Sequence, residues 1–303
     1  MARKAKEPKI KEEKVTKIGG KFIRRRKPNR SVGGDVAIMA MLLGVGLFML
    51  LPFVYAISNS VKPMDELFAF PPRFFARNPT LDNFSDLFII MSESWVPFSR
   101  YIFNTVFITA CGTVGHLFLA SMAAFALAKH EFPGKNFLFT AVIWALMFPA
   151  TVTYIPNYLI LSGLGWLDTY LALIVPAFAS TMGLFLMKQF MEGLPTALCE
   201  SARIDGANEF RVYWSIAMPN VKPAWLTLII FSFQSLWNTT GGVYVFSEQF
   251  KTLPYALNQI LAGGVARQGA GSAVAVFIMI VPIVMFMLTE SNVVETMASS
   301  GIK

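Results

Sequence analysis

Charged residues are scarce in this sequence: Asp, Glu, Lys and Arg make up 15% of its 303 residues, while 55% are hydrophobic. Soluble domains contain about 25% charged and about 45–50% apolar residues. The shortage of charge excludes an ordinary cytosolic enzyme and an acidic disordered chain, and it indicates a polytopic membrane protein. Cysteine is also rare. Cys111 and Cys199 fall in separate predicted regions, so nothing supports a disulfide framework or a four-ligand metal site.

Motifs for catalysis are lacking as well. The sequence contains no GxxxxGK[ST] phosphate-binding loop and no HExxH, GxSxG or CxxC motif. We therefore expect no catalytic residue, metal site or cofactor on this chain, and any energy for transport has to come from another polypeptide. His116, within a predicted span, is either a proton relay or a neutral side chain hydrogen-bonded to a neighbouring helix. We favour the second role because the uncharged stretches contain no carboxylate.

Long stretches without charge supply the predicted membrane spans. A helix needs on the order of 20 residues to cross a bilayer core about 30 Å thick. Six uncharged stretches of at least 18 residues predict an all-α integral membrane protein with six transmembrane helices in a domain at 36–293. The predicted spans are about 36–59, 102–128, 137–158, 169–190, 223–246 and 270–290.

Lys and Arg are distributed unequally around these spans. With the N-terminus inside, 20 of the 26 basic residues fall in inside segments and 6 outside. The positive-inside rule therefore places both tails, residues 1–35 and 294–303, in the cytoplasm. Arg24, Arg25, Arg26, Lys27 and Arg30 stand just before the first span. They predict an anchor on anionic lipid rather than a nucleic-acid-binding arm, so we expect a lipid bilayer and no nucleic acid among the partners.

The loop at residues 192–219 carries clear local structure signals. Pro195 suits the first turn of a helix, and Gly206 suits a C-terminal stop with positive φ. Asn208 is a good N-cap for a second helix. Two short helices that meet at a glycine form either a rigid knob beside the bilayer or an interfacial pair lying on it, and the residues alone leave both open. The second helix has an apolar stripe of Phe210, Tyr213, Trp214 and Ala217.

Residues 200–219 resemble the EAA signature (E-A-A-x3-G-x9-I-x-L-P) of ABC importer permeases. Ser201 replaces the second Ala, and Met218 replaces the Leu. The wider string ESARIDGANEFRVYWSIAMPNVKPA resembles the second permease subunit of maltose-type carbohydrate-uptake systems. Residues 60–84 and 231–238 also resemble that branch, in its first external segment and its fifth span. The signature positions are occupied by Glu200, Ser201, Ala202, Gly206, Ile216, Ala217, Met218 and Pro219.

The resemblance implies a type I ABC importer fold in the bacterial cytoplasmic membrane. This chain would form half of the pathway for sugars or oligosaccharides, and a homologous second permease the other half. An extracellular solute-binding protein would deliver the sugar, and a cytoplasmic ABC ATPase dimer would bind ATP and Mg. Residues 192–219, the coupling loop, would contact this ATPase through residues 195–208. The implied coupling residues are Glu200, Ser201, Ala202, Arg203, Asp205 and Gly206.

Within this loop, Glu200 and Arg203 are three residues apart, and we expect them to pair with each other or with the ATPase.

Polar residues of the fifth span are candidates for the sugar pathway, because sugars present many hydroxyls and no charge. The candidates are Gln234, Trp237, Asn238 and Thr239. Their spacing does not place all four on one helical face, and interhelical hydrogen bonding is the alternative role for each. The competing function for the chain is an ATP-independent channel or facilitator for polar solutes, with the loop as a surface feature. An intramembrane enzyme is disfavoured because the spans lack paired acids, an activated nucleophile and metal ligands.

Overall fold

A computed structural model describes residues 16–18, 21–23, 32–92 and 96–300 of the chain. The chain divides into two compact units, Met1–Phe53 and Val54–Lys303, which are described separately. The predicted lipid anchor at residues 24–30 lies outside the described residues, as do the last three residues of the predicted C-terminal tail.

The first unit contains a short hairpin and most of the first long helix. Strands β1 (Thr16–Ile18) and β2 (Lys21–Ile23) pair antiparallel, with Thr16 opposite Ile23. The sequence did not predict this hairpin. Helix α1 (Val32–Ser60) begins four residues before the first predicted span and continues without a break through Pro52.

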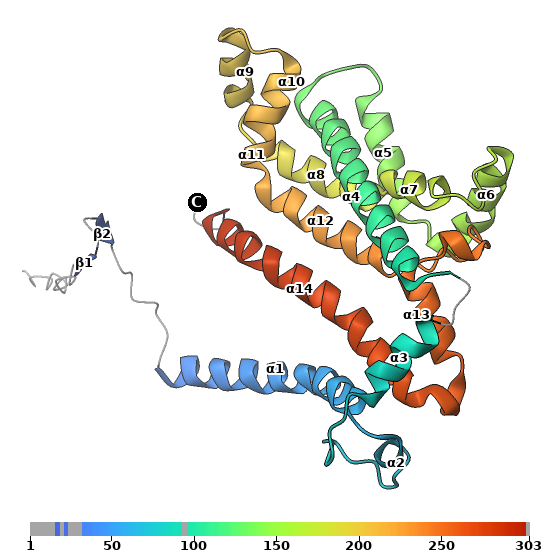
Figure 1. Ribbon diagram of the computed structural model, residues 1–303. Coiled ribbons are helices and arrows are strands. Elements are labelled where there is room, and N and C mark those ends of the chain that lie inside the picture. The colour runs from blue at the N-terminus through green and yellow to red at the C-terminus, as the bar shows by residue number, and fades with distance from the viewer. Residues whose placement is uncertain (1–15, 19–20, 24–31, 93–95, 301–303) are drawn as a thin grey trace, which may run out of the picture. The chain divides into compact units, whose positions relative to one another are not determined.

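The regular structure of the second unit is helical over residues 54–92 and 96–300 (Figure 1). Its elements are α2 (Met64–Leu67), α3 (Asp82–Ser92), α4 (Phe98–Lys129), α5 (Lys135–Leu146), α6 (Ala150–Gly163), α7 (Leu171–Phe178), α8 (Thr181–Glu192), α9 (Thr196–Ile204), α10 (Glu209–Arg211), the π-helix η1 (Val212–Ala217), α11 (Met218–Asn220), α12 (Lys222–Trp237), the 3-10 helix η2 (Glu248–Phe250), α13 (Leu253–Leu261), the 3-10 helix η3 (Gly264–Arg267) and α14 (Gln268–Ser300).

Among the described residues, four helical stretches are long and apolar enough to cross a membrane. The number rises to six if each of two sharply bent helix pairs, α5 with α6 and α10–α11 with α12, is one span. These four stretches are Gly33–Ser60, Phe98–Lys129, Leu171–Glu192 and Gln268–Leu288. The third comprises α7 and α8, which are separated at residues 179–180.

Three predicted spans have different bounds in the structure. The stretch 137–158 is divided between α5 and α6, which bend by 112° ahead of the α6 N-cap, Pro149. The stretch 223–246 is helical only to Trp237, because the chain then turns through Gly241 and Gly242, both with positive φ. The last helix extends to Ser300, inside the predicted tail, since no Gly or Pro follows Pro282 before Gly301.

Helix α4 runs through all three hydrophobic clusters of the second unit. Near its start, Tyr101 packs with residues of α3, α13 and α14. Ile108 belongs to a cluster with α7 and α12, and Phe125 belongs to a third with α8, α9, η1 and α12. Figure 1 shows α4 beside α7, α8 and α12. This helix is therefore the axis on which the unit is assembled.

Two glycines on α4 allow close helix packing. A Cβ at Gly112 would lie 2.5 Å from Leu236 Cδ1 on α12. A Cβ at Gly115 would lie 2.1 Å from Cε1 of Phe178 at the end of α7. Small residues permit such approaches between membrane helices, so these positions set the spacing of α4 from both neighbours.

Asn104 on α4 anchors the segment before α13. Its side chain is fully buried; Nδ2 donates to the carbonyls of Gln249 (2.9 Å) and Lys251 (2.8 Å), and Oδ1 accepts from the Tyr170 hydroxyl (2.7 Å). Thr105 accepts from the Leu253 N–H at 2.7 Å. These polar residues of a predicted span thus hold the segment 249–253 against α4.

Asp168 joins the α6–α7 connection to the loop after α12. Its Oδ1 accepts from the N–H groups of Phe246 (3.0 Å) and Ser247 (2.7 Å), and the Ser247 hydroxyl donates to Oδ2. Partial burial alone would raise the pKa of the Asp168 carboxyl. The hydrogen bonds from Ser247 and Phe246, aided by the charge of Lys251, outweigh burial and lower it.

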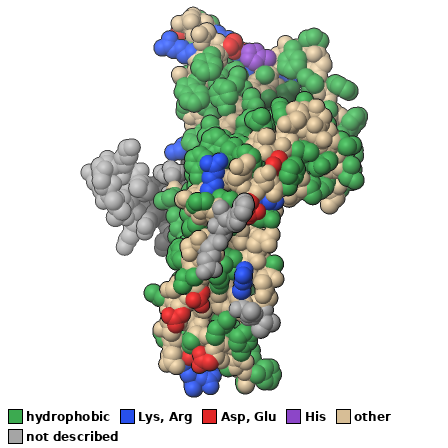
Figure 2. Space-filling view, turned by 45° about the vertical axis from the view of Figure 1, so that its right-hand side comes forward, with side chains coloured by type: hydrophobic (Ala, Val, Ile, Leu, Met, Phe, Trp, Pro, Cys, Tyr) green, Lys and Arg blue, Asp and Glu red, His purple; other side chains and the backbone are tan. Residues whose placement is uncertain are grey.

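Large hydrophobic side chains cover much of the surface in Figure 2. Exposed hydrophobic residues of the second unit include Phe137 (69% exposed), Trp144 (58%) and Ile155 (69%) on α5 and α6, and no described residue of α5 is buried. Exposing this much apolar surface to water is unfavourable, so we expect lipid or a second membrane subunit to cover it.

Candidate functional site

The coupling loop contains the turn that the sequence predicts at Gly206. Helix α9 ends in a Schellman motif: the Ala207 N–H donates to the Ala202 carbonyl, and the Gly206 N–H donates to the Arg203 carbonyl, both at 3.0 Å. Gly206 has φ +84°, which only glycine adopts without strain. The structure therefore fixes the direction in which the chain leaves α9.

The second arm of the loop begins as predicted but changes helix type. The Asn208 side chain accepts from the Arg211 N–H at 2.8 Å, which caps α10. The chain then continues as the π-helix η1, whose wider turn changes the direction of the following side chains. The predicted apolar stripe is divided into a buried pair and an exposed pair. Tyr213 and Ala217 are buried, whereas Phe210 and Trp214 are each 56% exposed.

Both arms are packed on the membrane helices. Cys199 of α9 and Val212 and Tyr213 of η1 are buried in one cluster with Met187 and Met191 of α8. The Tyr213 hydroxyl also lies 2.6 Å from Ser121 Oγ on α4. Burying a side chain of this size contributes about 1.5–3 kcal/mol. The loop is thus a packed extension of α4, α8 and α12.

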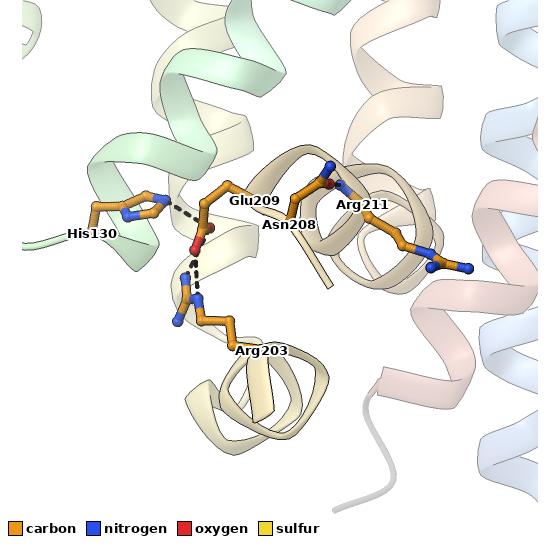
Figure 3. Close-up of polar contacts among 5 residues, drawn as sticks. All are labelled: His130, Arg203, Asn208, Glu209 and Arg211. Atoms are coloured by element: carbon orange, nitrogen blue, oxygen red, sulfur yellow. Dashed lines mark hydrogen bonds and ion pairs between the residues drawn. The ribbon is translucent and has the colours of Figure 1, made fainter. Parts of the chain in front are cut away.

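A network of charged side chains links the two arms of the loop across the Gly206 turn (Figure 3). Arg203 of α9 forms a bidentate pair with Glu209 of α10, with Nε–Oε1 at 2.7 Å and Nη2–Oε2 at 3.1 Å. His130, just after α4, lies 3.3 Å from Glu209 through Nε2 and Oε2. The Arg203 hydrogen bonds lower the pKa of the Glu209 carboxyl against the opposing effect of burial, and the charges of Arg203 and His130 add to this.

The last residue of α4 binds the other end of the loop. Lys129 Nζ donates to the Leu194 carbonyl at 2.5 Å, just before α9. Through Lys129, His130 and Ser121, α4 contacts the coupling loop before α9, after the Gly206 turn and within η1. A displacement of the loop therefore acts directly on this helix.

The six predicted coupling residues lie together around the end of α9 but point in different directions. Glu200, Ser201 and Asp205 are exposed, while Ala202 packs against the buried cluster. Arg203 pairs with Glu209, and the expected pair with Glu200 is not formed among the described residues. Ile204, one helical turn after Glu200 on α9, is 86% exposed and places apolar surface beside this carboxylate. This mixed face is available to a partner.

Glu209 and His130 are functional candidates that the sequence did not assign. The i, i+3 and i, i+4 rules relate residues of one helix, whereas Arg203 and Glu209 stand on opposite sides of a turn. One signal was present, because Glu209 follows the N-cap Asn208, where a carboxylate is favoured.

The four predicted pathway residues do not form one surface. Trp237 is buried and stacks on Phe233 with ring centroids 5.6 Å apart. Gln234 and Asn238 are exposed, and Asn238 Nδ2 donates to the Gln234 carbonyl at 2.8 Å. The Thr239 carbonyl accepts from Thr252 Oγ1 at 2.6 Å. Among the described residues, no group of three or more His, Cys, Asp or Glu is placed to hold a metal ion.

Four to six candidate spans joined to a packed polar loop place the chain in the class of multi-pass membrane proteins. The chain belongs to the family described as binding-protein-dependent transport system inner membrane component, whose model matches residues 116–294. That range includes the whole coupling loop.

Relatives support this assignment, and a solved structure shows the same fold. The chain is 38% identical to protein LplC of Bacillus subtilis over 209 residues, which cover 67% of each chain. It is 27% identical over 281 residues to the arabinooligosaccharides transport system permease protein AraQ of Bacillus subtilis, covering 92% of this chain and 99% of AraQ. A chain of a bacterial ABC transporter involved in import of the acidic polysaccharide alginate has the same fold, with TM-score 0.74, 22% identity, and coverage of 88% of this chain and 99% of that one.

Proposed function

We propose that this chain is the permease subunit of a binding-protein-dependent ABC importer for sugars or oligosaccharides, and that its coupling loop receives motion from a separate ATPase. The observation that carries the coupling role is the attachment of this loop to the end of α4 at three points, before α9, at α10 and within η1, inside the range matched by the family model. The transport of oligosaccharides by AraQ, as its name states, supports the substrate class.

The remaining subunits follow from what the chain would need. A homologous permease would complete the pathway, an ATPase dimer would bind ATP and Mg, and an extracellular solute-binding protein would deliver the sugar. When ATP draws the ATPase subunits together, the exposed face of α9 would move with them. Because both arms of the loop are packed, α4, α8 and α12 would follow as rigid bodies.

Reconstitution tests this function against the ATP-independent channel. Proteoliposomes containing this chain, its sister permease and the ATPase are supplied with a binding protein loaded with arabinotriose. The proposal predicts uptake only with ATP and all four components, and faster ATP hydrolysis when the loaded binding protein is present. Equal uptake by vesicles containing this chain alone, without ATPase, would instead establish a channel.

A further inference from the structure

A cavity of about 310 Å³ lies between α4, α12 and the junction of α7 with α8. Ligand pockets generally range from about 300 to 1,000 Å³. The polar side chains that line it are His116, Ser180, Ser232 and Ser235, and the ring of Phe231, 49% exposed, forms part of its wall. The lining contains no Lys, Arg, Asp or Glu.

The environment of His116 determines which ring nitrogen carries the proton. Helix α7 ends at Phe178, which leaves its last carbonyls without partners inside the helix. His116 Nδ1 lies 3.2 Å from the Phe178 carbonyl oxygen. A carbonyl only accepts, so Nδ1 donates, and a neutral imidazole with its proton on Nδ1 presents Nε2 as an acceptor. This contact agrees with the expected neutral His116 bonded to a neighbouring helix.

Nε2 is the atom of this side chain that the protein leaves without a partner. His116 is 1% exposed, and Nε2 has no hydrogen bond to any described residue. Gly183 makes room for the ring, because a Cβ there would lie 2.2 Å from Nε2. The hydroxyls of Thr109 and Thr113, on the same face of α4, are also buried and unpartnered among the described residues. Buried polar groups are rarely left so.

We propose that this cavity binds a neutral sugar ring of the transported oligosaccharide, with one sugar hydroxyl donating to His116 Nε2. The inference rests on the proposed function and deepens it by assigning a substrate contact and a charge class. The serine hydroxyls supply further hydrogen bonds, and the exposed face of Phe231 packs against the sugar. A uronate carboxylate is disfavoured, because it only accepts hydrogen bonds and no cation lines the cavity.

Two substitutions at His116 separate the ligand contact from the structural one. His116→Asn places an amide N–H where Nδ1 stands, keeping the donor to Phe178 but losing the acceptor at Nε2. His116→Gln places an amide oxygen near Nε2, keeping the acceptor and losing the donor. In the reconstituted transporter, we expect His116→Asn to raise the KM for arabinotriose uptake about 2- to 10-fold, the effect of one hydrogen bond. His116→Gln should keep the wild-type KM.

The opposite order, with His116→Gln impaired and His116→Asn normal, would establish a purely structural role and overturn the proposal. Equal KM values for all three proteins would overturn it as well. The KM comparison requires a transporter that takes up arabinotriose. If no sugar is taken up with ATP, the proposed function is wrong. The proposed sugar site is then tested separately by a binding measurement.

Binding is measured on the purified full-length chain in nanodiscs, labelled with ¹⁵N-histidine. The chain has only two histidines, so His130→Gln leaves His116 as the single signal. Arabinotriose should move the resonance of unprotonated Nε2 in the direction of hydrogen-bond acceptance, and trigalacturonate should not. A spectrum that neither sugar changes, or that only trigalacturonate changes, overturns the inference.

Discussion

Removing the Glu209 carboxylate should lower the amount of sugar taken up per ATP hydrolysed, while the protein still folds. Glu209→Gln keeps the side-chain shape but removes the charge that holds Arg203 and His130. The side chains of Arg203 and Glu209 are 32% and 51% exposed, so the pair belongs to the surface class, worth about 0.2–1 kcal/mol. Its bidentate geometry and the second contact to His130 place the total near the upper end, at about 1 kcal/mol.

A loss of about 1 kcal/mol lowers the ratio of correctly to incorrectly oriented loops about fivefold. The buried contacts of Cys199, Val212 and Tyr213 are untouched, so the complex should assemble normally. The assay is arabinotriose taken up per ATP hydrolysed in proteoliposomes. We expect this ratio to fall by up to about fivefold while ATPase activity persists.

Glu131→Gln is the matched control. Glu131 pairs with Lys135 at 2.8 Å near the same end of α4, but it is 91% exposed, and no hydrogen bond or ion pair joins it to the described residues of the coupling loop. If Glu209→Gln and Glu131→Gln take up the same amount of arabinotriose per ATP hydrolysed, the network of Arg203, Glu209 and His130 has no role in coupling. A double-mutant cycle with Arg203→Gln adds a second criterion: additive losses would mean that Arg203 and Glu209 act separately.

Three further predictions concern the turn, the helix contacts and the loop anchor. Gly206→Val forces a branched residue to φ +84° at a cost of about 1–2 kcal/mol and should reduce uptake per ATP, whereas Gly134→Val, at φ +86° before α5, carries similar strain and should not. Gly115→Ala should destabilise the unit by about 1–3 kcal/mol, because its Cβ meets the Phe178 ring, and should lower the Tm in detergent. Asp168→Asn should lower the Tm at neutral pH. Because folding lowers the pKa of Asp168, the ionised carboxylate stabilises the folded protein above pH 3.8, the ordinary pKa, and this stabilisation is lost as the pH falls through the folded-state pKa. A Tm difference between Asp168→Asn and wild type that persisted in full at such low pH would contradict this.

Local signals predicted the coupling loop well. Pro195, Gly206 and Asn208 each act through the backbone within a few residues, and the structure contains the predicted stop at Gly206 and the predicted cap at Asn208. The π-helix that follows has no comparable signal. Within it Trp214 is exposed, although periodicity predicted that it would share a face with the buried Tyr213.

Contacts between segments far apart in the chain, and some helix ends, could not be predicted from the sequence. Charge gaps located α12 but not its end at Trp237, because a stretch without charge includes an apolar loop as readily as a helix. The Gly241–Gly242 pair was the signal that marked the boundary. Likewise, His130 reaches Glu209 only because α4 and the coupling loop fold side by side, 79 residues apart along the chain.

The length of α4 has a mechanical consequence. Near one end of the helix, Asn104 is hydrogen-bonded to the segment before α13. At the other end, Lys129 and His130 contact the coupling loop. At 1.5 Å per residue, about 38 Å separates Asn104 from Lys129, which is more than the thickness of a bilayer core. A single unbroken helix of this length can reach from one face of a membrane to the other. In the proposed importer, a protein that docks outside would act on the ATPase inside by tilting this helix.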